Sequence, residues 1–565
     1  MKYHEQAPLR HVGDVPSMGA TRYGEKLAFE YRGEEYSYRE LESRSNRVAN
    51  ALTDRGVGPG DRVALYVENS LQFPETFFGA LKAGAVAVPL NHRMDVDRLT
   101  YILGDADVSV LVASAVFPSV VTDLAPHAPE TWIPGGGEAD GDELLDYDEL
   151  VDGASPEFDR PERGFEDVAL QCYTSGTTGD PKGVLTTHRN LLATAQSYTS
   201  RSGFDPEDDV TLLVLPLFHM YGLSTVMLTN LYNGATVVLK TLPVAQSLLS
   251  AITEYEVTSF AGIPAIFVEM VQEYESDPDA YDLSSIESVG CGAAPLADDT
   301  RRRIESVFDT PLVEGWGMTE TTPAGTTGSA YGVHTAAGCI GQPVPDMEIR
   351  LVDPATREVR VSEHLLDPTA AVDISDELDF DDEEAVTGEM AVRGPQVFAG
   401  YDGLPEKNAE VFGRDEPSDE PRREAEWFYT GDIARVDEDR FLWMVDRVDD
   451  MLIVGGENVY PAEVENALFD HPEVQAAAVV AVPHEVKGEA PVAFVVLEPG
   501  VDPESVSEEA VRRFALERVP TYAHPRRVFV VDELPRSGTQ KVQRYKLEAA
   551  AAERLDGPLS PSETL

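Results

Sequence analysis

The chain has 565 residues, enough for three or four domains of ordinary size, so it is not a single small binding module. Hydrophobic residues make up 42% of it and aromatic residues 8%, which excludes a chain that is disordered throughout. Against 44 Lys and Arg stand 101 Asp and Glu, and the formal net charge of −57 repels nucleic acid and anionic lipid.

The acidic residues are spread from one end of the chain to the other, and only nine of the basic residues are lysine. Dense carboxylates stay hydrated at high salt, and dissolved salt screens their mutual repulsion. A functional acidic face is the alternative, but such a face would concentrate the charge locally. We therefore expect adaptation to a salty cytoplasm, with a composition similar to that of haloarchaeal proteins.

The cysteines are Cys172, Cys291 and Cys339, an odd number without the CxxC spacing of a zinc site, so the sequence predicts neither a disulfide framework nor structural zinc. The first 17 residues lack the apolar core of a signal peptide. No stretch approaches the roughly 18 apolar residues that a membrane span needs. We expect a soluble protein of the reducing cytoplasm.

Short apolar segments alternate with helix-like segments in the first part of the chain, which is typical of an α/β fold. Residues 62–67 and 85–90 predict strands, and residues 38–56 predict a helix. Residues 127–167 are rich in Gly, Pro, Asp and Glu and predict a long surface connection. Strand and helix signals resume over 168–352, which predicts a second α/β block.

Two acidic stretches, residues 367–386 and 413–425, lack apolar periodicity and predict loops without chemistry. The last 110 or so residues predict a compact unit of their own. Its strands are expected over 476–482 and 491–498, and its helix over 505–519. A small C-terminal domain therefore follows a large N-terminal part.

The most informative segment follows a predicted strand at 168–174 and precedes a helical stretch that begins near His188. Its residues Ser175–Gly183 (SGTTGDPKG) offer backbone N–H groups and hydroxyls, and Lys182 adds positive charge. The segment is not a Walker A loop, because the spacing G-x-x-x-x-G-K-[ST] is absent. We predict a phosphate-binding turn between a strand and a helix.

Together with Tyr173 and Thr174, this segment resembles the AMP-binding signature of the adenylate-forming superfamily of acyl-CoA synthetases, peptide-synthetase adenylation domains and luciferases. Six more segments follow in the family's order: LPLFHMYG (215–222), GCGAAPL (290–296), EGWGMTETTP (314–323), WFYTGD (427–432), DRVDD (446–450) and LPRSGTQK (534–541). The resemblance covers nearly the whole chain. It implies an α/β fold with a large multi-subdomain N-terminal adenylation domain (1–445), a hinge (446–450) and a small mobile α+β C-terminal domain (451–565).

The resemblance implies a nucleotide site. In it, Glu320 holds Mg²⁺ through hard oxygen ligands, Thr319 touches the α-phosphate, and Asp432 accepts the ribose hydroxyls beside Arg447. Trp316 and the turn Gly292–Pro295 are implied to border the adenine. The alternatives are a surface acid for Glu320 and core packing for Trp316. The implied nucleotide-binding residues are Thr174, Ser175, Gly176, Thr177, Thr178, Gly179, Lys182, Ala293, Ala294, Pro295, Glu314, Gly315, Trp316, Gly317, Met318, Thr319, Asp432, Arg447 and Lys541.

Lys541 resembles the family's catalytic lysine, whose ammonium bridges the substrate carboxylate and the α-phosphate. Gln540 precedes it where the family commonly has glycine, which bears on the geometry of the loop. Asp449 matches the hinge about which the small domain rotates after adenylation. Gly455 and Gly456 are implied to line the channel of the CoA thiol. The implied catalytic residues are Lys541, Thr319, Glu320 and His219.

Eight residues are implied to line the acyl pocket: Phe218, His219, Tyr221, Gly222, Ala261, Gly262, Gly292 and Met318. Amino-acid-adenylating relatives carry an aspartate where this chain has His219, and burying an ammonium without a counter-ion is costly, so an amino acid is disfavoured. The alternative for His219 is a core histidine. The small apolar lining favours a medium- or long-chain fatty acid over acetate, and an aryl acid such as a cinnamate stays open.

We therefore predict an ATP-dependent, AMP-forming acid–CoA ligase that uses Mg²⁺ and coenzyme A. The alternatives are a ligase for an aryl or other acid, an adenylating enzyme that loads a carrier protein, and a non-enzymatic nucleotide-binding relative. Intact Lys541, Glu320, Asp432 and Arg447 argue against the last. No nucleic-acid partner and no transmembrane segment are expected, and a homodimer stays open.

Overall fold

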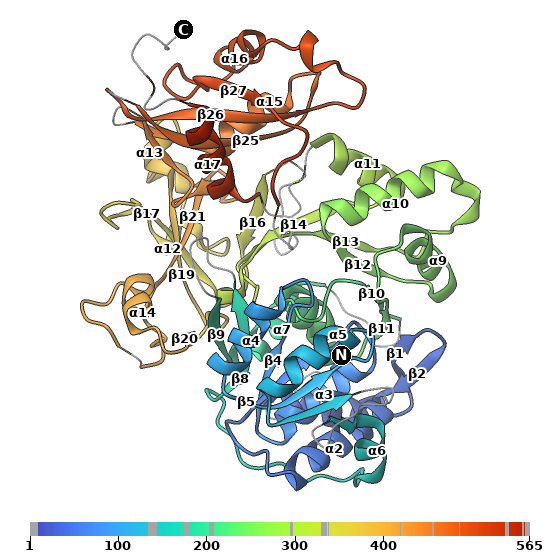
Figure 1. Ribbon diagram of the computed structural model, residues 1–565. Helices are drawn as coiled ribbons and strands as arrows, with labels where there is room; N and C mark the ends of the chain where they lie inside the picture. The colour runs from blue at the N-terminus through green and yellow to red at the C-terminus, as the bar shows by residue number, and fades with distance from the viewer. Residues whose placement is uncertain are drawn as a thin grey trace. The chain divides into compact units, whose positions relative to one another are not determined.

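The computed structural model describes residues 9–133, 144–174, 181–202, 208–293, 296, 298–328, 336, 338–418, 420–454, 457–484, 486–536, 542–555 and 559. By its contacts the chain forms two compact units (Figure 1). Unit 1 comprises Met1–Ile349, Leu366–Ala370 and Val392–Tyr429, and unit 2 comprises Arg350–Leu365, Ala371–Ala391 and Thr430–Leu565. Over the part of the chain that is described, no helix is both long and apolar enough to cross a membrane.

The first sheet of unit 1 has the strand order β20-β9-β8-β4-β3-β5-β6-β7. Its strands from β8 to β7 are parallel to their neighbours, whereas β9 is antiparallel to both β8 and β20. The strands are β3 (Arg62–Tyr66), β4 (Val86–Pro89), β5 (Val108–Ala113), β6 (Glu130–Ile133), β7 (Leu144–Asp146), β8 (Val168–Thr174), β9 (Lys182–Thr187) and β20 (Gly400–Tyr401).

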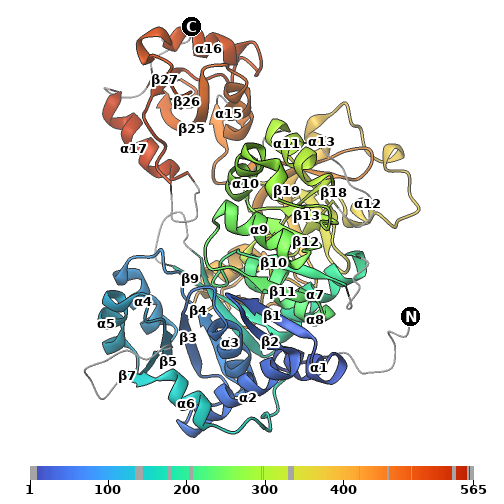
Figure 2. The same cartoon turned by 90° about the vertical axis from the view of Figure 1, so that its right-hand side faces the viewer.

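Helices cover both faces of this sheet because its strands are apolar on both sides. Val63 and Leu65 pack with α2 (Tyr38–Asp54) and α3 (Gln72–Lys82), whereas their chain neighbours on the opposite face pack with α4 (Val96–Asp105) and α5 (Pro118–Leu124) (Figure 2). Helix α2 begins where the sequence supplies a capping box: the Ser37 hydroxyl accepts from the Glu40 N–H, and the Glu40 carboxylate accepts from the Ser37 N–H.

The second sheet of unit 1 has the order β16-β15-β14-β13-β12-β10-β11-β1-β2. Strands β10 to β14 and β1 form its parallel part, so the carboxyl ends of β12, β13 and β14 lie at one edge. The strands are β1 (Leu27–Tyr31), β2 (Glu34–Ser37), β10 (Val210–Leu213), β11 (Thr236–Leu239), β12 (Ser259–Gly262), β13 (Ser288–Cys291), β14 (Leu312–Trp316), β15 (Thr326–Thr327) and β16 (Cys339–Pro343).

The remaining helices of unit 1 connect or flank these strands. They are α1 (Val15–Arg22), α6 (Tyr147–Gly153), α7 (His188–Ser202), the π-helix η3 (Tyr221–Leu228), α8 (Thr229–Asn233), α9 (Ala245–Tyr255), α10 (Pro264–Ser276), α11 (Asp298–Phe308), the 3₁₀ turn η5 (Thr319–Thr321) and α14 (Pro405–Phe412). A π-helix is rare and is frequently found at functional sites, and this one begins with Tyr221 and Gly222, two of the residues predicted to line the acyl pocket.

Unit 2 contains one run of strands in the order β18-β17-β19-β21-β22 and a C-terminal sheet in the order β24-β23-β26-β25, with β27 beside β26. The elements are β17 (Glu348–Val352), β18 (Val359–Val361), α12 (Glu363–Leu366), α13 (Glu383–Val386), β19 (Thr387–Arg393), β21 (Phe428–Val436), β22 (Leu442–Arg447), β23 (Leu452–Val454), β24 (Glu457–Val459), α15 (Pro461–Phe469), β25 (Val474–His484), β26 (Gly488–Leu497), α16 (Glu508–Leu516), β27 (Arg527–Val530) and α17 (Arg544–Arg554).

The C-terminal sheet has a separate core on each face. Val479 and Val495 face α15 and α16, whereas Val480 and Phe494 face α17. This alternation follows from the period of two along each strand, which sends successive side chains to opposite faces. Figure 2 shows α17 and the pair α15–α16 on opposite sides of the sheet.

Most predicted elements are confirmed, with ends shifted by a few residues. Strands 62–67 and 85–90 are β3 and β4, and helix 38–56 is α2. Strands 476–482 and 491–498 lie in β25 and β26, and helix 505–519 contains α16. The acidic stretches at 367–386 and 413–425 contain only short helical turns or none.

The surface connection predicted over 127–167 is wrong for part of its length. Strands β6 and β7 add to the first sheet there, and α6 follows them. The apolar anchors are Trp132 and Tyr147, both fully buried, with ring centroids 6.4 Å apart. Two large aromatic side chains outweigh the local Gly, Pro and acidic composition because each buries a large apolar surface.

Candidate functional site

The strands on either side of the predicted phosphate-binding turn form an antiparallel hairpin. Strand β8 ends at Thr174, β9 begins at Lys182, and these two residues are register partners. Helix α7 begins at His188, as the sequence predicted, but strand β9 lies between the turn and this helix and was not predicted. Strand β9 forms because β8 and β20 both pair with it. Ser175, Gly176, Thr177, Thr178 and Gly179 lie outside the described residues.

Glu320 lies in the 3₁₀ turn η5 after β14, in the same unit as Lys182. Its side chain is buried, with 6% of the residue exposed, so it is not an ordinary surface acid. The Tyr401 hydroxyl donates to Glu320 Oε1 at 2.8 Å, and the Phe398 N–H donates to the Glu320 carbonyl at 2.8 Å. A buried carboxylate held in one orientation can serve as a ligand to a cation. The neighbouring Thr319 is half-buried.

The residues predicted to border the adenine lie at the ends of β13 and β14. Trp316 is buried at 7% exposure, and a Cβ added at Gly325 would lie 2.3 Å from the Trp316 ring, so that ring packs against a glycine. A Cβ at Gly317 would lie 2.1 Å from the Pro323 carbonyl oxygen, which requires glycine there as well. Ala293 is exposed with φ 69°. Ala294 and Pro295 lie outside the described residues.

Glu314, Gly315 and Met318 are each partly buried. Burial raises the pKa of Glu314 to about 7, against the opposing attraction of Arg301, whose Nε lies 3.9 Å from its carboxylate. Glu314 is the register partner of Cys291, and burial raises the pKa of that thiol to about 12, with Glu314 adding to the shift. Sequence reasoning missed Arg301, which is 2% exposed and also pairs with Asp298 and Glu305.

The two residues predicted to contact the ribose are brought together in unit 2. Asp432 on β21 is the register partner of Arg447 on β22, and Arg447 Nε lies 3.1 Å from Asp432 Oδ1. Gly431, with φ 75°, lies within β21 directly before Asp432, and its N–H donates to Glu389 Oε1 at 2.9 Å. Burial raises the pKa of Glu389. A carboxylate with a neighbouring guanidinium is thus held on two paired strands.

Residues 446 and 447 of the predicted hinge segment end β22, and residues 448–450 form a turn between β22 and β23. Asp449 is exposed, and the N–H groups of Asp450 and Met451 both donate to the Arg447 carbonyl, at 3.1 and 3.0 Å. Asp446 is buried and accepts from the Ala462 N–H at the start of α15 at 2.8 Å. Burial raises the pKa of Asp446 to about 6, although the N–H groups of Ala462 and Arg447, which both donate to its carboxylate, oppose the shift.

Lys541, Gln540, Gly455 and Gly456 lie outside the described residues, but the base of the lysine loop is described. Arg536 and Val542 form an antiparallel bridge, and the Gln543 N–H donates to the Pro535 carbonyl at 2.8 Å. The loop that carries Lys541 is therefore closed at its base by backbone hydrogen bonding.

The residues predicted to line the acyl pocket gather at the ends of β10, β12 and β13. Cβ atoms added at Gly290 and Gly292 would lie 3.9 and 3.7 Å from the Tyr221 hydroxyl oxygen, so both glycines border this phenol. Burial raises the pKa of Tyr221, which keeps the hydroxyl protonated. A Cβ at Gly222 would lie 2.6 Å from the Pro216 carbonyl oxygen, and only glycine fits there. Ala261 is half-buried and Gly262 is buried.

His219 and Phe218 have different surroundings although they are neighbours in the chain. His219 is exposed, so it is not a core histidine, and its Nδ1 accepts from the Tyr221 N–H at 3.3 Å. Phe218 is buried and packs edge-on against His92, with ring centroids 4.5 Å apart. Sequence reasoning missed His92, which stacks on Phe117 at 5.2 Å. No motif of the sequence singled it out.

Comparison with known proteins identifies the family. The family model described as AMP-binding enzyme matches residues 18–402, and the model for the AMP-binding enzyme C-terminal domain matches residues 463–541. The chain belongs to the AMP-binding enzyme family. The large N-terminal α/β domain and the smaller C-terminal domain predicted from the sequence are those of this family.

The relatives are CoA ligases with different acids in their names. A feruloyl-CoA synthase from Amycolatopsis sp is 34% identical over 95% of this chain and 96% of the relative. A long-chain-fatty-acid–CoA ligase from Escherichia coli O157:H7 is 30% identical over 96% of this chain and 95% of the relative. The crystal structure of ATP-bound MatB from Rhodopseudomonas palustris is 28% identical, with a TM-score of 0.80 over 96% of this chain and 99% of that one.

This member of the AMP-binding family is an AMP-forming acid–CoA ligase, as the sequence predicted. It makes an acyl-adenylate and then an acyl-CoA thioester, and the use of ATP and CoA fits that reaction. Relatives named for an aryl acid and for a fatty acid both match nearly the whole chain. Among the described residues, no three His, Cys, Asp or Glu side chains form a metal cluster.

Proposed function

We propose that this ligase activates a carboxylic acid with an apolar body, a medium- or long-chain fatty acid in the first instance. The observation that carries the proposal is the neighbourhood of Tyr221, where Gly290 and Gly292 border the phenol, Ala261 lies beside Gly290 and no carboxylate stands at position 219. An alkyl chain needs no polar partner, whereas a buried ammonium would need a counter-ion.

The site residues have distinct roles in this proposal. Two anions must approach each other when a carboxylate attacks the α-phosphate, so positive groups must face the reacting oxygens. Lys182 at the start of β9 faces the phosphates, and Lys541 bridges the carboxylate and α-phosphate oxygens. Asp432, held by Arg447, accepts the ribose hydroxyls, because a carboxylate can accept from two neighbouring hydroxyls at once.

Magnesium fits the residues present. Mg²⁺ prefers oxygen ligands and is commonly bound in nucleotide sites by one or two carboxylates together with substrate phosphates. Glu320 is a buried carboxylate held in one orientation. When bound, the ion would neutralise phosphate charge. Glu320 would hold it, and the groups that hydrogen-bond to Glu320 would orient that carboxylate.

A second candidate substrate is a hydroxylated aryl acid. The specific observation in its favour is the Tyr221 hydroxyl, which stays protonated and can hydrogen-bond to a substrate hydroxyl. The 34% identical relative named feruloyl-CoA synthase adds support. A site that hydrogen-bonds a substrate hydroxyl loses far more when the partner is removed than an apolar site does.

The domain assignment is part of the proposal: residues 1–445 form the adenylation domain, 446–450 the hinge and 451–565 the mobile domain. Two observations support it. The two family models match on either side of the hinge segment. Asp449 lies exposed in the turn between β22 and β23, where a change of backbone angles meets little packed structure.

The experiment is AMP formation from ATP, CoA and Mg²⁺ with acetate, octanoate, palmitate, cinnamate and ferulate, using the wild-type chain and Tyr221→Phe. A fatty-acid ligase turns over octanoate or palmitate best, and Tyr221→Phe leaves kcat/KM within about threefold. A hydroxyaryl ligase prefers ferulate over cinnamate, and the variant loses about 100-fold or more on ferulate alone. Preference for acetate contradicts both candidates.

A further inference from the structure

Tyr401 contacts two of the proposed phosphate-site residues at once. Its hydroxyl donates to Glu320 Oε1 at 2.8 Å, and the Lys182 Nζ lies 5.7 Å from the centroid of its ring. Tyr401 is 7% exposed and Glu320 is 6% exposed, so both the donor and the acceptor are buried. The three residues lie far apart in the sequence, and no sequence motif identified Tyr401.

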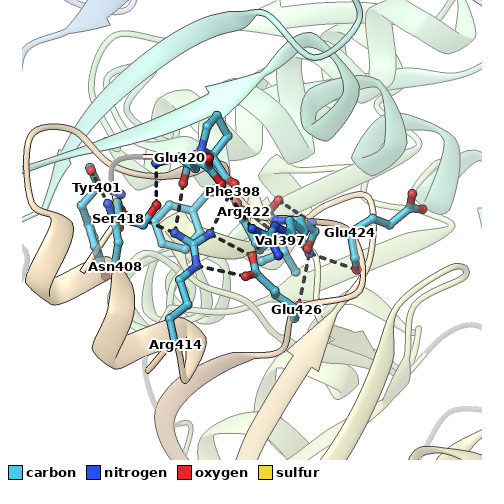
Figure 3. Close-up of polar contacts among 12 residues, drawn as sticks. Val397, Phe398, Tyr401, Asn408, Arg414, Ser418, Glu420, Arg422, Glu424 and Glu426 are labelled. Atoms are coloured by element: carbon cyan, nitrogen blue, oxygen red, sulfur yellow. Dashed lines mark hydrogen bonds and ion pairs between the residues drawn. The ribbon is translucent and has the colours of Figure 1, made fainter. Parts of the chain in front are cut away.

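The backbone of Tyr401 is held on both sides. On one side Tyr401 is the register partner of Val184 on β9, and the next residue's N–H, that of Asp402, donates to the Gly183 carbonyl at 2.9 Å. On the other side the Asn408 side chain accepts from the Tyr401 N–H and donates to the Tyr401 carbonyl, both at 2.8 Å (Figure 3). The Asn408 amide thus bonds the outer edge of β20 as a further strand would.

The segment around β20 is fixed as well. The Arg422 guanidinium donates to the carbonyls of Gly394, Val397 and Phe398, at 2.9, 3.3 and 3.3 Å, while Arg414 pairs with Glu426 through two contacts of 3.0 and 2.8 Å (Figure 3). The Phe398 N–H also donates to the Glu320 carbonyl. The position of the Tyr401 ring is therefore set by β9, by α14 and by the Arg422 contacts.

We propose that Tyr401 is a positioning residue that fixes the orientation of the Glu320 carboxylate and the place of the Lys182 ammonium relative to each other. The hydroxyl acts on the carboxylate, because a hydrogen bond to a metal ligand fixes the orientation in which it meets the cation. The ring acts on the ammonium, because the face of an aromatic ring attracts a cation within about 6 Å. The inference rests on the proposed function, in which these two groups face the magnesium ion and the phosphates.

The test compares Tyr401→Phe, which removes only the hydroxyl, with Tyr401→Leu, which removes the ring as well. The first measurement is Mn²⁺ binding in the presence of the unreactive analogue α,β-methylene-ATP, followed by the electron paramagnetic resonance signal of free Mn²⁺. Tyr401→Phe is expected to weaken Mn²⁺ binding about 10-fold or more. Tyr401→Leu is expected to weaken the analogue itself further at saturating Mn²⁺, because Lys182 loses its ring contact.

The control is Tyr281→Phe. Tyr281 donates to Glu273 Oε1 at 2.8 Å, the same bond between the same groups at a place without proposed chemistry. It should leave Mn²⁺ binding unchanged. In turnover assays, Tyr401→Phe should raise the Mg²⁺ concentration that gives half-maximal rate. The KM values for the acid and for CoA should stay within about twofold of the wild type. A general loss of packing would change all of these values together.

A double-mutant cycle keeps the proposal falsifiable if Tyr401 variants lose stability. If the hydroxyl acts through Glu320, then Tyr401→Phe has no further effect on Mn²⁺ binding once Glu320 is Gln. Equal losses in both backgrounds, or wild-type Mn²⁺ binding by Tyr401→Phe, overturn the proposal. Failure of the proposed function is a different result: the wild-type chain would then bind Mn²⁺ with the analogue yet release no AMP with any acid of the panel.

Discussion

Glu314 illustrates how burial changes the chemistry of a single side chain. Its side chain is 15% exposed, and burial raises its pKa from an ordinary value near 4.5 to about 7, although Arg301 lies nearby. The folded chain therefore holds a proton that the unfolded chain releases between these two values. The stability that Glu314 contributes falls as the pH rises through this window and stays low above it.

The variant Glu314→Gln removes this cost and is expected to be more stable than the wild type at pH 8, by on the order of 2 kcal/mol, with a much smaller difference near pH 5. Thermal unfolding of both chains at the two pH values measures the effect. The matched control is Glu287→Gln, because Glu287 is exposed just before β13 in the same sheet. If the difference in stability between Glu314→Gln and the wild type does not increase with pH, the raised pKa of Glu314 is contradicted.

Lys541 carries the sharpest prediction about chemistry. Replacing it by alanine removes the positive charge that we propose lies between the carboxylate and the α-phosphate, so adenylation should fall by at least about 1,000-fold. Thioester formation from a supplied acyl-adenylate should be spared. Pyrophosphate exchange and CoA-thioester assays measure the two steps separately.

The control for Lys541→Ala is Lys546→Ala, which removes an exposed lysine five residues later on α17. Its adenylation rate should match that of the wild type. Adenylation that survives in Lys541→Ala at wild-type rate would show that another group supplies the charge.

At the scale of an element, the turn between β22 and β23 carries the proposed hinge residue Asp449. Proline at position 449 fixes φ near −65° and removes an N–H, so it should prevent the turn between β22 and β23 from changing its backbone angles. Asp449→Pro is expected to adenylate at close to the wild-type rate and to lose at least about 100-fold in thioester formation. Asp449→Ala is the control, because it removes the carboxylate but leaves the turn free to move.

Single-turnover assays of the two half-reactions test this prediction. Wild-type thioester formation by Asp449→Pro would place the hinge elsewhere. Equal loss of both half-reactions would instead indicate that the substitution disrupts the fold around Arg447.

At the scale of elements, the sequence predicted the strands that contain strong apolar runs, such as β3, β4 and β26. A short apolar run rich in β-branched residues is typical of a buried strand. It missed β9, which lies between the phosphate-binding turn and α7, because nothing local decides whether this short segment forms a strand. The pairing of β9 with β20, more than 200 residues later, decides that question. Tyr401 was missed for the same reason, since its partners come from distant strands.

The sequence predicted those residues of the candidate site that belong to recognisable motifs. Asp432 and Arg447 stand in two motifs, and the structure pairs them. His92 and Arg301 stand in none, because a lone histidine or arginine has no local pattern that marks its packing. The surroundings of such residues can be recognised only once the structure shows which residues they contact.

At the scale of the whole molecule, the net charge of −57 makes the stability of the fold depend on the salt concentration. The screening length falls from about 10 Å at 0.1 M to about 3 Å at 1 M salt, so repulsion between surface carboxylates weakens steeply. The melting temperature is expected to rise by about 5–10 °C between 0.1 M and 2 M KCl, and activity to rise with it.

Sucrose is the control for the salt series, because it favours burial without screening charge. It should raise the melting temperature by less than KCl does. Equal stability in dilute buffer and in 2 M KCl would contradict adaptation to salt.

The contacts of Arg544 tie the start of α17 to the turn that carries Asp449. Arg544 Nε lies 3.4 Å from Asp450 Oδ2, and its guanidinium also pairs with Glu465 on α15. The loop that bears Lys541 is closed immediately before this arginine. One guanidinium therefore joins the turn to α15 and α17, so the proposed rotation at Asp449 would carry both helices together, and a chain that lost Arg544 would lose this connection.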